Sequence, residues 1–227
     1  MSEALLARVR KLLAMAEDPA CTPGEAEAFT EKAAELIAKH GVDQAMLAAG
    51  DPAADPVGDR VVTVDPPYAR DKAGLLAAVA APMRCRVVHL ERRGLARSHL
   101  FGHAADLERV ELLFTSLLVQ AAHGLAASPV PAGEHAAAYR RSWMAGYTQA
   151  ISGRLWAAER SAAAETPGAA IVLVDRTDLV ERRRDEAYPE LARMRPRRLR
   201  GSGLLHGYQA GQTAHLGGAE VTGVTSP

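Results

Sequence analysis

Residues 1–48 carry the start and stop signals of a helical hairpin, and this punctuation constrains the fold more than any other feature of the chain. Apolar residues recur at helical spacing over residues 5–16, which predicts a first helix. Asp18-Pro19 ends that helix, because the residue before a proline avoids the α region. Thr22 is a favourable N-cap for a second helix, and Glu25 can close a capping box with it.

The second helix is predicted to run to about His40, where Gly41 is a C-cap signal. Asp43 is then expected to cap a short third helix that ends near Leu47. Residues 50–60, GDPAADPVGDR, have the composition of a linker. They predict a boundary between two parts of the chain.

The pattern as a whole predicts an α+β protein, in which an N-terminal helical hairpin module precedes a mainly helical domain with a short sheet. The expected parts are a helical N-terminal domain (1–49), a linker (50–60), an α+β C-terminal domain (61–217) and a flexible tail (218–227). Periodicity in the C-terminal domain predicts strands at 61–64, 85–90, 98–101 and 169–174, and helices at 72–81, 106–126, 134–164, 177–187 and 204–216.

The net charge, the cysteine content and the lengths of the apolar runs argue against several classes of protein. The formal net charge is zero over 227 residues, so bulk electrostatics indicates no particular partner. Cys21 and Cys85 form no CxxC pair, so neither a disulfide framework nor a thiolate zinc site is expected. The first residues lack the apolar core of a signal peptide, and no apolar run approaches the roughly 20 residues that span a bilayer. We therefore expect a cytoplasmic protein with no membrane contact.

The hairpin resembles the N-terminal domain of the family called domain of unknown function 2786, over about residues 5–48. The matching pieces are Lys11-Leu12-Leu13, Ala16, Thr22-Pro23, Glu25-Ala26, Ala33 and Lys39-His40-Gly41. The segments LFGHAADLERVELLFTSLL, YRRSWMAGYTQAISGRL and GYQAGQTAHL resemble the C-terminal partner domain of that family. The resemblance implies this two-part architecture and a bacterial or phage setting, but it supplies no catalytic residues.

Three histidines are candidates for a metal site. His99 and His103 are four residues apart, a spacing that places two imidazoles on one face of a helix. The glutamate that follows the first histidine of a zincin helix is replaced here by Leu100. His89 could approach across a strand hairpin. Surface or capping histidines remain the expected interpretation, so no metal and no cofactor is predicted.

An arginine-rich segment, residues 193–203, is the candidate anion site. Arginines precede the sequence Gly201-Ser202-Gly203 at the start of the last predicted helix, and helix N-termini favour anions. The proposed contacts are Arg193, Arg195, Arg197, Arg198, Arg200 and Ser202. The alternative is a solvated basic loop with a glycine-rich joint, since the segment has no P-loop motif.

Other patterns favour structural roles. The pairs Ser142/Gly146 and Gly207/Gly211, each four residues apart, predict a tight helix–helix contact. Cys85 lies in an apolar strand and is interpreted as a core residue. The acidic face of the hairpin disfavours direct binding of duplex DNA by that module and favours a protein partner.

These observations predict a non-catalytic binding or adaptor protein in a bacterial or phage and mobile-element setting, with nucleic acid or a protein complex as its partner. Two alternatives stay open: an enzyme that acts on a phosphorylated substrate through the basic loop, and a structural or assembly subunit. Neither the oligomeric state nor the ligand follows from the sequence.

Overall fold

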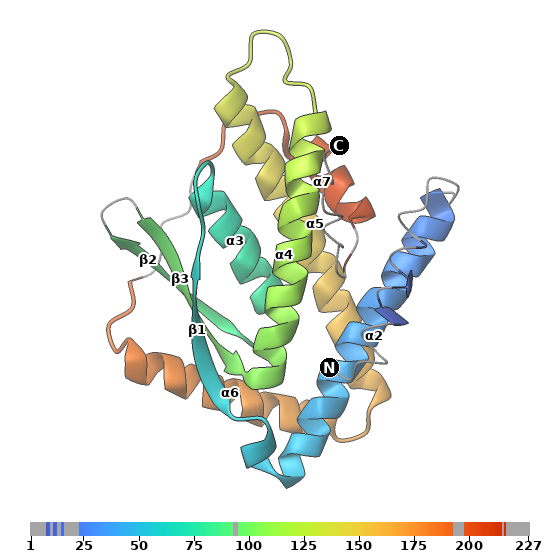
Figure 1. Ribbon diagram of the computed structural model, residues 1–227, viewed down its shortest axis with the longest axis vertical. Helices are drawn as coiled ribbons and strands as arrows, with labels where there is room; N and C mark the ends of the chain where they lie inside the picture. Colours follow the sequence, from blue (N-terminus) through green and yellow to red (C-terminus); the bar gives the residue numbers. More distant parts are fainter. Residues whose placement is uncertain are drawn as a thin grey trace, which may run out of the picture.

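The computed structural model describes residues 8–9, 11–12, 15, 23–92, 95–192, 198–214 and 216. Helices and one small sheet make up this part of the chain (Figure 1), which confirms the predicted α+β class. The elements, in chain order, are α2 (Pro23–Gly50), the 3-10 helix η1 (Pro52–Ala54), β1 (Val57–Thr63), α3 (Ala69–Ala80), β2 (Arg86–Arg92), β3 (Leu95–His103), α4 (Ala104–Ala127), α5 (Ala136–Glu165), α6 (Ala169–Ala187) and α7 (Leu204–Thr213).

The sheet has the strand order β1-β3-β2 and is antiparallel throughout. The strand hairpin predicted around residues 93–94 is confirmed as β2 and β3, and the two turn residues lie outside the described residues. Because side chains alternate across a strand, the sheet has two different faces. Leu100 belongs to the main core together with Leu75 of α3, whereas Phe101 packs on the opposite face with Val180 of α6.

The helix α4 supplies much of the core. Its residues Val110, Leu113 and Leu117 are fully buried, and the Tyr147 hydroxyl of α5 donates a hydrogen bond to the Leu117 carbonyl. In the part of the chain that the structure describes, α4 is also the one helix long and apolar enough, by length and composition, to cross a membrane.

The predicted tight contact between two helices is confirmed as the packing of α5 on α7. A Cβ atom on Gly146 would overlap the Leu204 carbonyl, and one on Gly207 would overlap the Trp143 carbonyl. The Ser142 hydroxyl accepts a hydrogen bond from the backbone N–H at the start of α7, at 3.0 Å. The small residues therefore let the two backbones touch directly.

The helix α2 continues through Gly41, so the predicted C-cap and the separate third helix after Asp43 are wrong. Gly41 serves a different purpose: a Cβ atom there would overlap the guanidinium of Arg109, which is itself 1% exposed. Glycine is needed at this position for the close approach of a side chain and not for a left-handed backbone. A tertiary contact thus overrides the local stop signal.

Residues 169–174 were predicted as a buried strand but form the first turns of α6. Burial there follows helical spacing, because Ala169, Arg176 and Val180 are buried while Ile171 and Val174 are exposed. The run AAIVLV has the composition of a strand, yet only one side of this segment touches the protein. Contacts at helical intervals therefore decide its conformation over intrinsic β propensity.

The predicted linker is partly regular structure, because β1 begins at Val57 and η1 precedes it. The buried Asp55 lies between them. The buried face of α2, with Ala33 and Ile37, belongs to the same core cluster as Leu113 of α4. Independent folding of residues 1–49 stays a prediction. The hairpin turn at 18–22 and the tail at 218–227 lie outside the described residues.

We expect Gly41→Ala to destabilise the protein by about 1–3 kcal/mol, because the added methyl group would displace the buried Arg109 guanidinium. Gly153→Ala is the matched control, since Gly153 lies on α5 with nothing within 4 Å of its Cβ position. That change should stabilise the protein by up to about 1 kcal/mol, through helix propensity alone. Chemical denaturation of both variants measures the difference, and equal effects would contradict the role given to Gly41.

Candidate functional site

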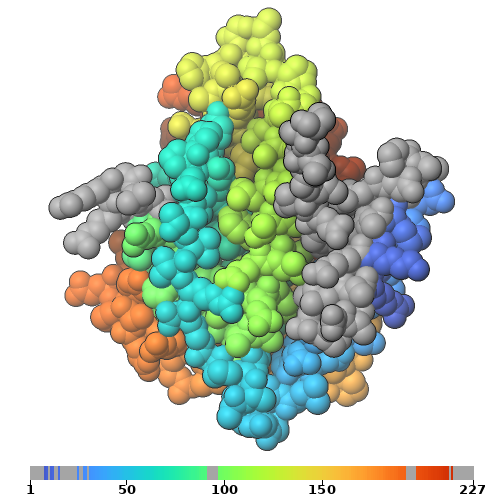
Figure 2. Space-filling model, in the orientation of Figure 1, coloured from blue at the N-terminus to red at the C-terminus, as the bar shows by residue number. Residues whose placement is uncertain are grey.

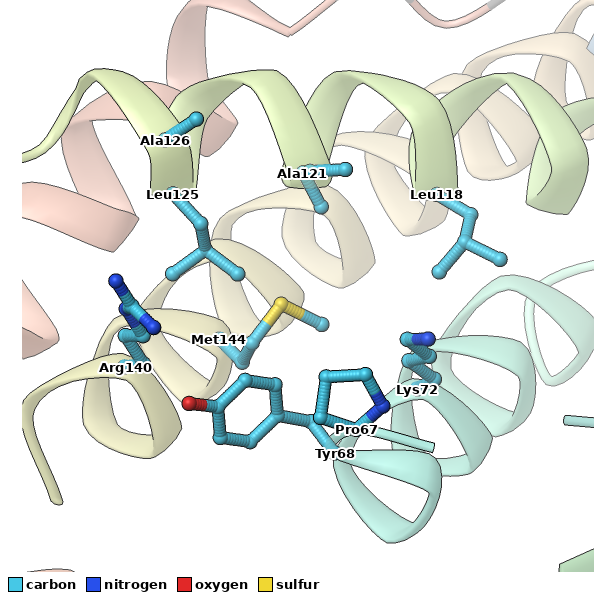
Figure 3. Close-up of a pocket in the computed structure, with 10 residues that line it drawn as sticks. Pro67, Tyr68, Lys72, Leu118, Ala121, Leu125, Ala126, Arg140 and Met144 are labelled. Carbon is cyan, nitrogen blue, oxygen red and sulfur yellow. The ribbon is translucent and has the colours of Figure 1, made fainter. Parts of the chain in front are cut away.

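A cavity of about 360 Å³ opens where α3 begins, α4 ends and α5 begins. Its walls are mostly apolar: α4 contributes Leu118, Ala121 and Leu125, α5 contributes Met144, and Pro67 closes one side (Figure 3). Figure 2 shows the segment that leads from β1 to α3 (cyan) beside the C-terminal half of α4 (yellow-green). The volume lies in the range of small-ligand sites, roughly 300–1,000 Å³.

The polar groups of this cavity come from three residues. Tyr68 precedes α3 with φ +64, a left-handed conformation that is unfavourable for a residue with a side chain. Its carbonyl accepts the backbone N–H groups of Asp71 (2.9 Å) and Lys72 (3.0 Å), which hold that conformation. The Lys72 ammonium donates to the Asp65 carbonyl at 3.0 Å. Arg140, exposed on α5, makes no hydrogen bond or ion pair with the residues that the structure describes.

Sequence reasoning missed this cavity. Three alanines on α4, at positions 121, 122 and 126, leave space that larger residues would fill. That is a weak signal in a chain this rich in alanine. The conformation of Tyr68 leaves no signal in the sequence at all.

The predicted anion segment is described only in part. Arg193, Arg195 and Arg197 lie outside the described residues, and Arg198 and Arg200 are exposed. Ser202 donates both its backbone N–H (2.7 Å) and its hydroxyl (2.6 Å) to the carboxylate of Glu134. These two bonds hold the pKa of Glu134 below its usual value. The donors of Ser202 are thus already used by an internal anion.

The three candidate metal ligands have separate partners. The His89 ring contacts the Ser98 hydroxyl at 3.2 Å, and the His99 ring contacts Tyr188 and Asp59, each at 2.8 Å. The His103 ring donates to the Asp55 carbonyl at 2.7 Å. By strand alternation His89 lies on the opposite face of the sheet from His99 and His103. Over the described ranges no group of three His, Cys, Asp or Glu side chains is placed to hold a metal ion.

A cluster of buried charges, absent from the sequence predictions, lies at the start of α4. Asp106 accepts from Arg109 at 2.8 Å, from Arg84 at 3.1 Å and from Arg176 at 3.3 Å. Arg84 and Arg109 also bind Glu159 of α5, the former at 2.9 Å. We call the six groups that pair here the buried ion cluster: Asp55, Arg84, Asp106, Arg109, Glu159 and Arg176.

The buried ion cluster also includes the end of a helix. The Asp55 carboxylate accepts from Arg176 at 2.6 Å and from the backbone N–H of Ala105, in the first turn of α4, at 2.9 Å. Each of the six residues is less than a tenth exposed, and three positive charges balance three negative ones. Opposite charges lie within pairing distance throughout, so we interpret the cluster as structural. The Nε atoms of its three arginines are buried without a hydrogen-bond partner among the described residues.

Electrostatics in the cluster shift two pKa values. Burial raises the pKa of the Asp106 carboxyl, but the three surrounding guanidinium groups lower it by more, so the net direction is downward. Burial raises the pKa of the nearby Cys85 thiol well above its usual range, and the charge of Asp106 raises it further. Cys85 therefore stays a neutral thiol in the core, which confirms its interpretation as a core residue.

Comparison with known proteins identifies one segment of the chain. The structure described above is that of an α+β protein with an apolar cavity between helices. Residues 4–44 match the family described as a protein of unknown function, DUF2786, and this segment belongs to that domain family. The match ends within α2. No curated protein and no solved structure matches the chain. The predicted likeness of the later segments to the partner domain stays a prediction.

We expect the free energy of unfolding to fall as the pH drops below about 4, in part because Asp106 must then be protonated. Its folded pKa lies below its unfolded value of about 3.9. The stabilisation is therefore fully present above the unfolded pKa and is lost as the pH falls through the folded one. Asp106→Asn should cost about 3–5 kcal/mol near neutral pH, since it leaves buried arginines unpaired, and should flatten the pH dependence.

Denaturant titrations of wild type and variant between neutral and acidic pH measure this effect. Asp178→Asn, an exposed change on α6, is the control and should follow the wild-type curve. Parallel curves for Asp106→Asn and wild type would show that the carboxylate does not contribute as described.

Proposed function

We propose that this protein is a non-catalytic binding protein and that the cavity between α3, α4 and α5 is its ligand site. The observation that supports the proposal is the combination of apolar walls with a few polar groups, an arrangement typical of small-molecule sites. The family assignment of the N-terminal segment is compatible with a binding role but does not specify one.

The walls of the cavity are pre-organised for binding. Leu118, Ala121 and Met144 lie on helices whose other faces are buried in the core, so the binding surface is held in place before a ligand arrives. A ligand that buries on the order of 200 Å² of apolar surface would gain about 5 kcal/mol from the hydrophobic effect. Part of that gain is lost to association entropy, so affinities in the micromolar to millimolar range are expected for simple apolar ligands.

A second candidate function, contact with nucleic acid through residues 193–203, is supported by one observation. Arg198 and Arg200 are exposed and form no ion pair with the described residues, so their charges remain available to a phosphate. Glu134 opposes this role, because its carboxylate already lies on Ser202.

For the cavity, we expect saturable binding of a neutral naphthylamine dye, seen as a rise in its fluorescence. Ala126→Phe places a ring against the cavity and should weaken dye binding at least about tenfold. Ala127→Phe adds the same ring at the next residue of α4, which does not line the cavity, and should leave binding unchanged. No saturable signal, or equal losses in both variants, would refute the cavity as the ligand site.

For the basic segment, we expect oligonucleotide affinity to fall in Arg198→Ala/Arg200→Ala and the salt dependence to decrease by about two charges. Arg160→Ala/Arg182→Ala removes the same charge from exposed positions on α5 and α6 and is the control. Titrations at two salt concentrations measure both. If wild type does not bind even at low salt, the nucleic-acid candidate is wrong.

A further inference from the structure

The cavity is lined mostly by apolar residues, and its two charged lining residues are both cationic. Of the described residues at its surface, Lys72 and Arg140 are basic and none is acidic. Carboxylates therefore do not compensate these charges from within the lining. Both charged groups of the lining would attract an anionic group on a ligand.

The two cations lie at different ends of the cavity. In Figure 3 the Tyr68 hydroxyl points toward the Arg140 guanidinium, while the Lys72 ammonium lies beyond Pro67 at the other end. Lys72 is engaged by the Asp65 carbonyl. Arg140 has no such partner among the described residues, so its full set of donors faces solvent and the mouth.

Arginine is the side chain best suited to bind a carboxylate, because its planar fork can donate two parallel hydrogen bonds. The phenolic hydroxyl of Tyr68 adds a third donor from the same side. Between them and the core lie Leu125 and Met144, and Met144 is unbranched and adapts to irregular apolar shapes. The cavity thus combines a cationic, hydrogen-bond-donating end with an apolar interior.

We propose that the ligand of this cavity is an apolar carboxylate, with its carboxylate held by Arg140 and Tyr68 and its hydrocarbon part against Leu118, Leu125 and Met144. This inference rests on the proposed function, because it assigns a chemical class to the ligand of the same cavity. Aliphatic and aromatic acids share the chemistry that the site recognises. Lys72 adds to the positive potential without contacting the carboxylate.

The test uses the full-length protein and displacement of the neutral naphthylamine dye by three ligands of equal chain length: decanoate, decanol and decylamine. Wild type should bind decanoate at least about tenfold more tightly than decanol, and decylamine most weakly. Arg140→Gln should remove most of the preference for decanoate and should weaken the binding of decanoate far more than that of decanol. Because Arg140 is exposed, the variant is expected to fold, which its thermal unfolding checks.

The matched control is Arg141→Gln, an exposed neighbour on α5 that does not line the cavity; it should keep the full preference for decanoate. Arg140→Lys should restore part of the preference, since the charge returns without the fork. Tyr68→Phe should reduce it by a smaller factor than Arg140→Gln.

The outcomes separate the two proposals. If the dye binds but decanoate and decanol displace it equally, or if Arg140→Gln keeps the preference, the carboxylate assignment is wrong and the apolar site stands. If the preference is lost equally in Arg141→Gln, bulk charge and not a contact causes it, and the assignment is again wrong. If the dye does not bind at all, the proposed function is refuted, and this inference with it.

Discussion

The buried ion cluster ties together the end of the molecule where α2, α4, α5 and α6 meet. Each of its charges costs several kcal/mol to remove from water, and only its partners offset that cost. A missing partner would leave an uncompensated charge in the interior. The loop before β1, the turn before β2 and the three helices must therefore all be in place for the cluster to be stable. The cluster therefore couples segments as distant in the chain as Asp55 and Arg176, which pair at 2.6 Å.

The segment that belongs to the DUF2786 family contacts this cluster by close packing at a glycine. Gly41 lies within the matched residues and makes room for the Arg109 guanidinium, which lies outside them. Burial lowers the pKa of the adjacent His40, and the charge of Arg109 contributes in the same direction. Both effects favour the neutral imidazole beside the buried Arg109. A glycine that looks like a helix end in isolation is a packing requirement in the assembled protein.

Local signals explain which parts of the fold could be predicted. The strand hairpin, the long helices α4 and α5, and the glycines between α5 and α7 follow from periodicity and side-chain size, which depend on neighbouring residues alone. Gly41 and the start of α6 were mispredicted, because contacts distant in sequence decide their conformations. The buried ion cluster and the cavity were missed for the same reason. No spacing in the sequence indicates that Asp106 meets Glu159 through shared arginines, or that Tyr68 adopts a left-handed backbone.

The antiparallel pair α4 and α5 places the cluster and the cavity at opposite ends of one rigid frame. Asp106 and Leu125 are separated by nineteen residues of α4, about 28 Å at 1.5 Å per residue, and Arg140 and Glu159 are separated by the same length of α5. At the cluster end, Arg109 of α4 pairs with Glu159 of α5; at the cavity end, Ala121, Ala122 and Ala126 of α4 line the cavity. Because both helices are rigid and are paired at the cluster end, the apolar walls of the cavity keep their positions at the other end. Stability and the proposed ligand binding therefore depend on separate groups of residues, and changes at the mouth of the cavity should leave the buried ion cluster intact.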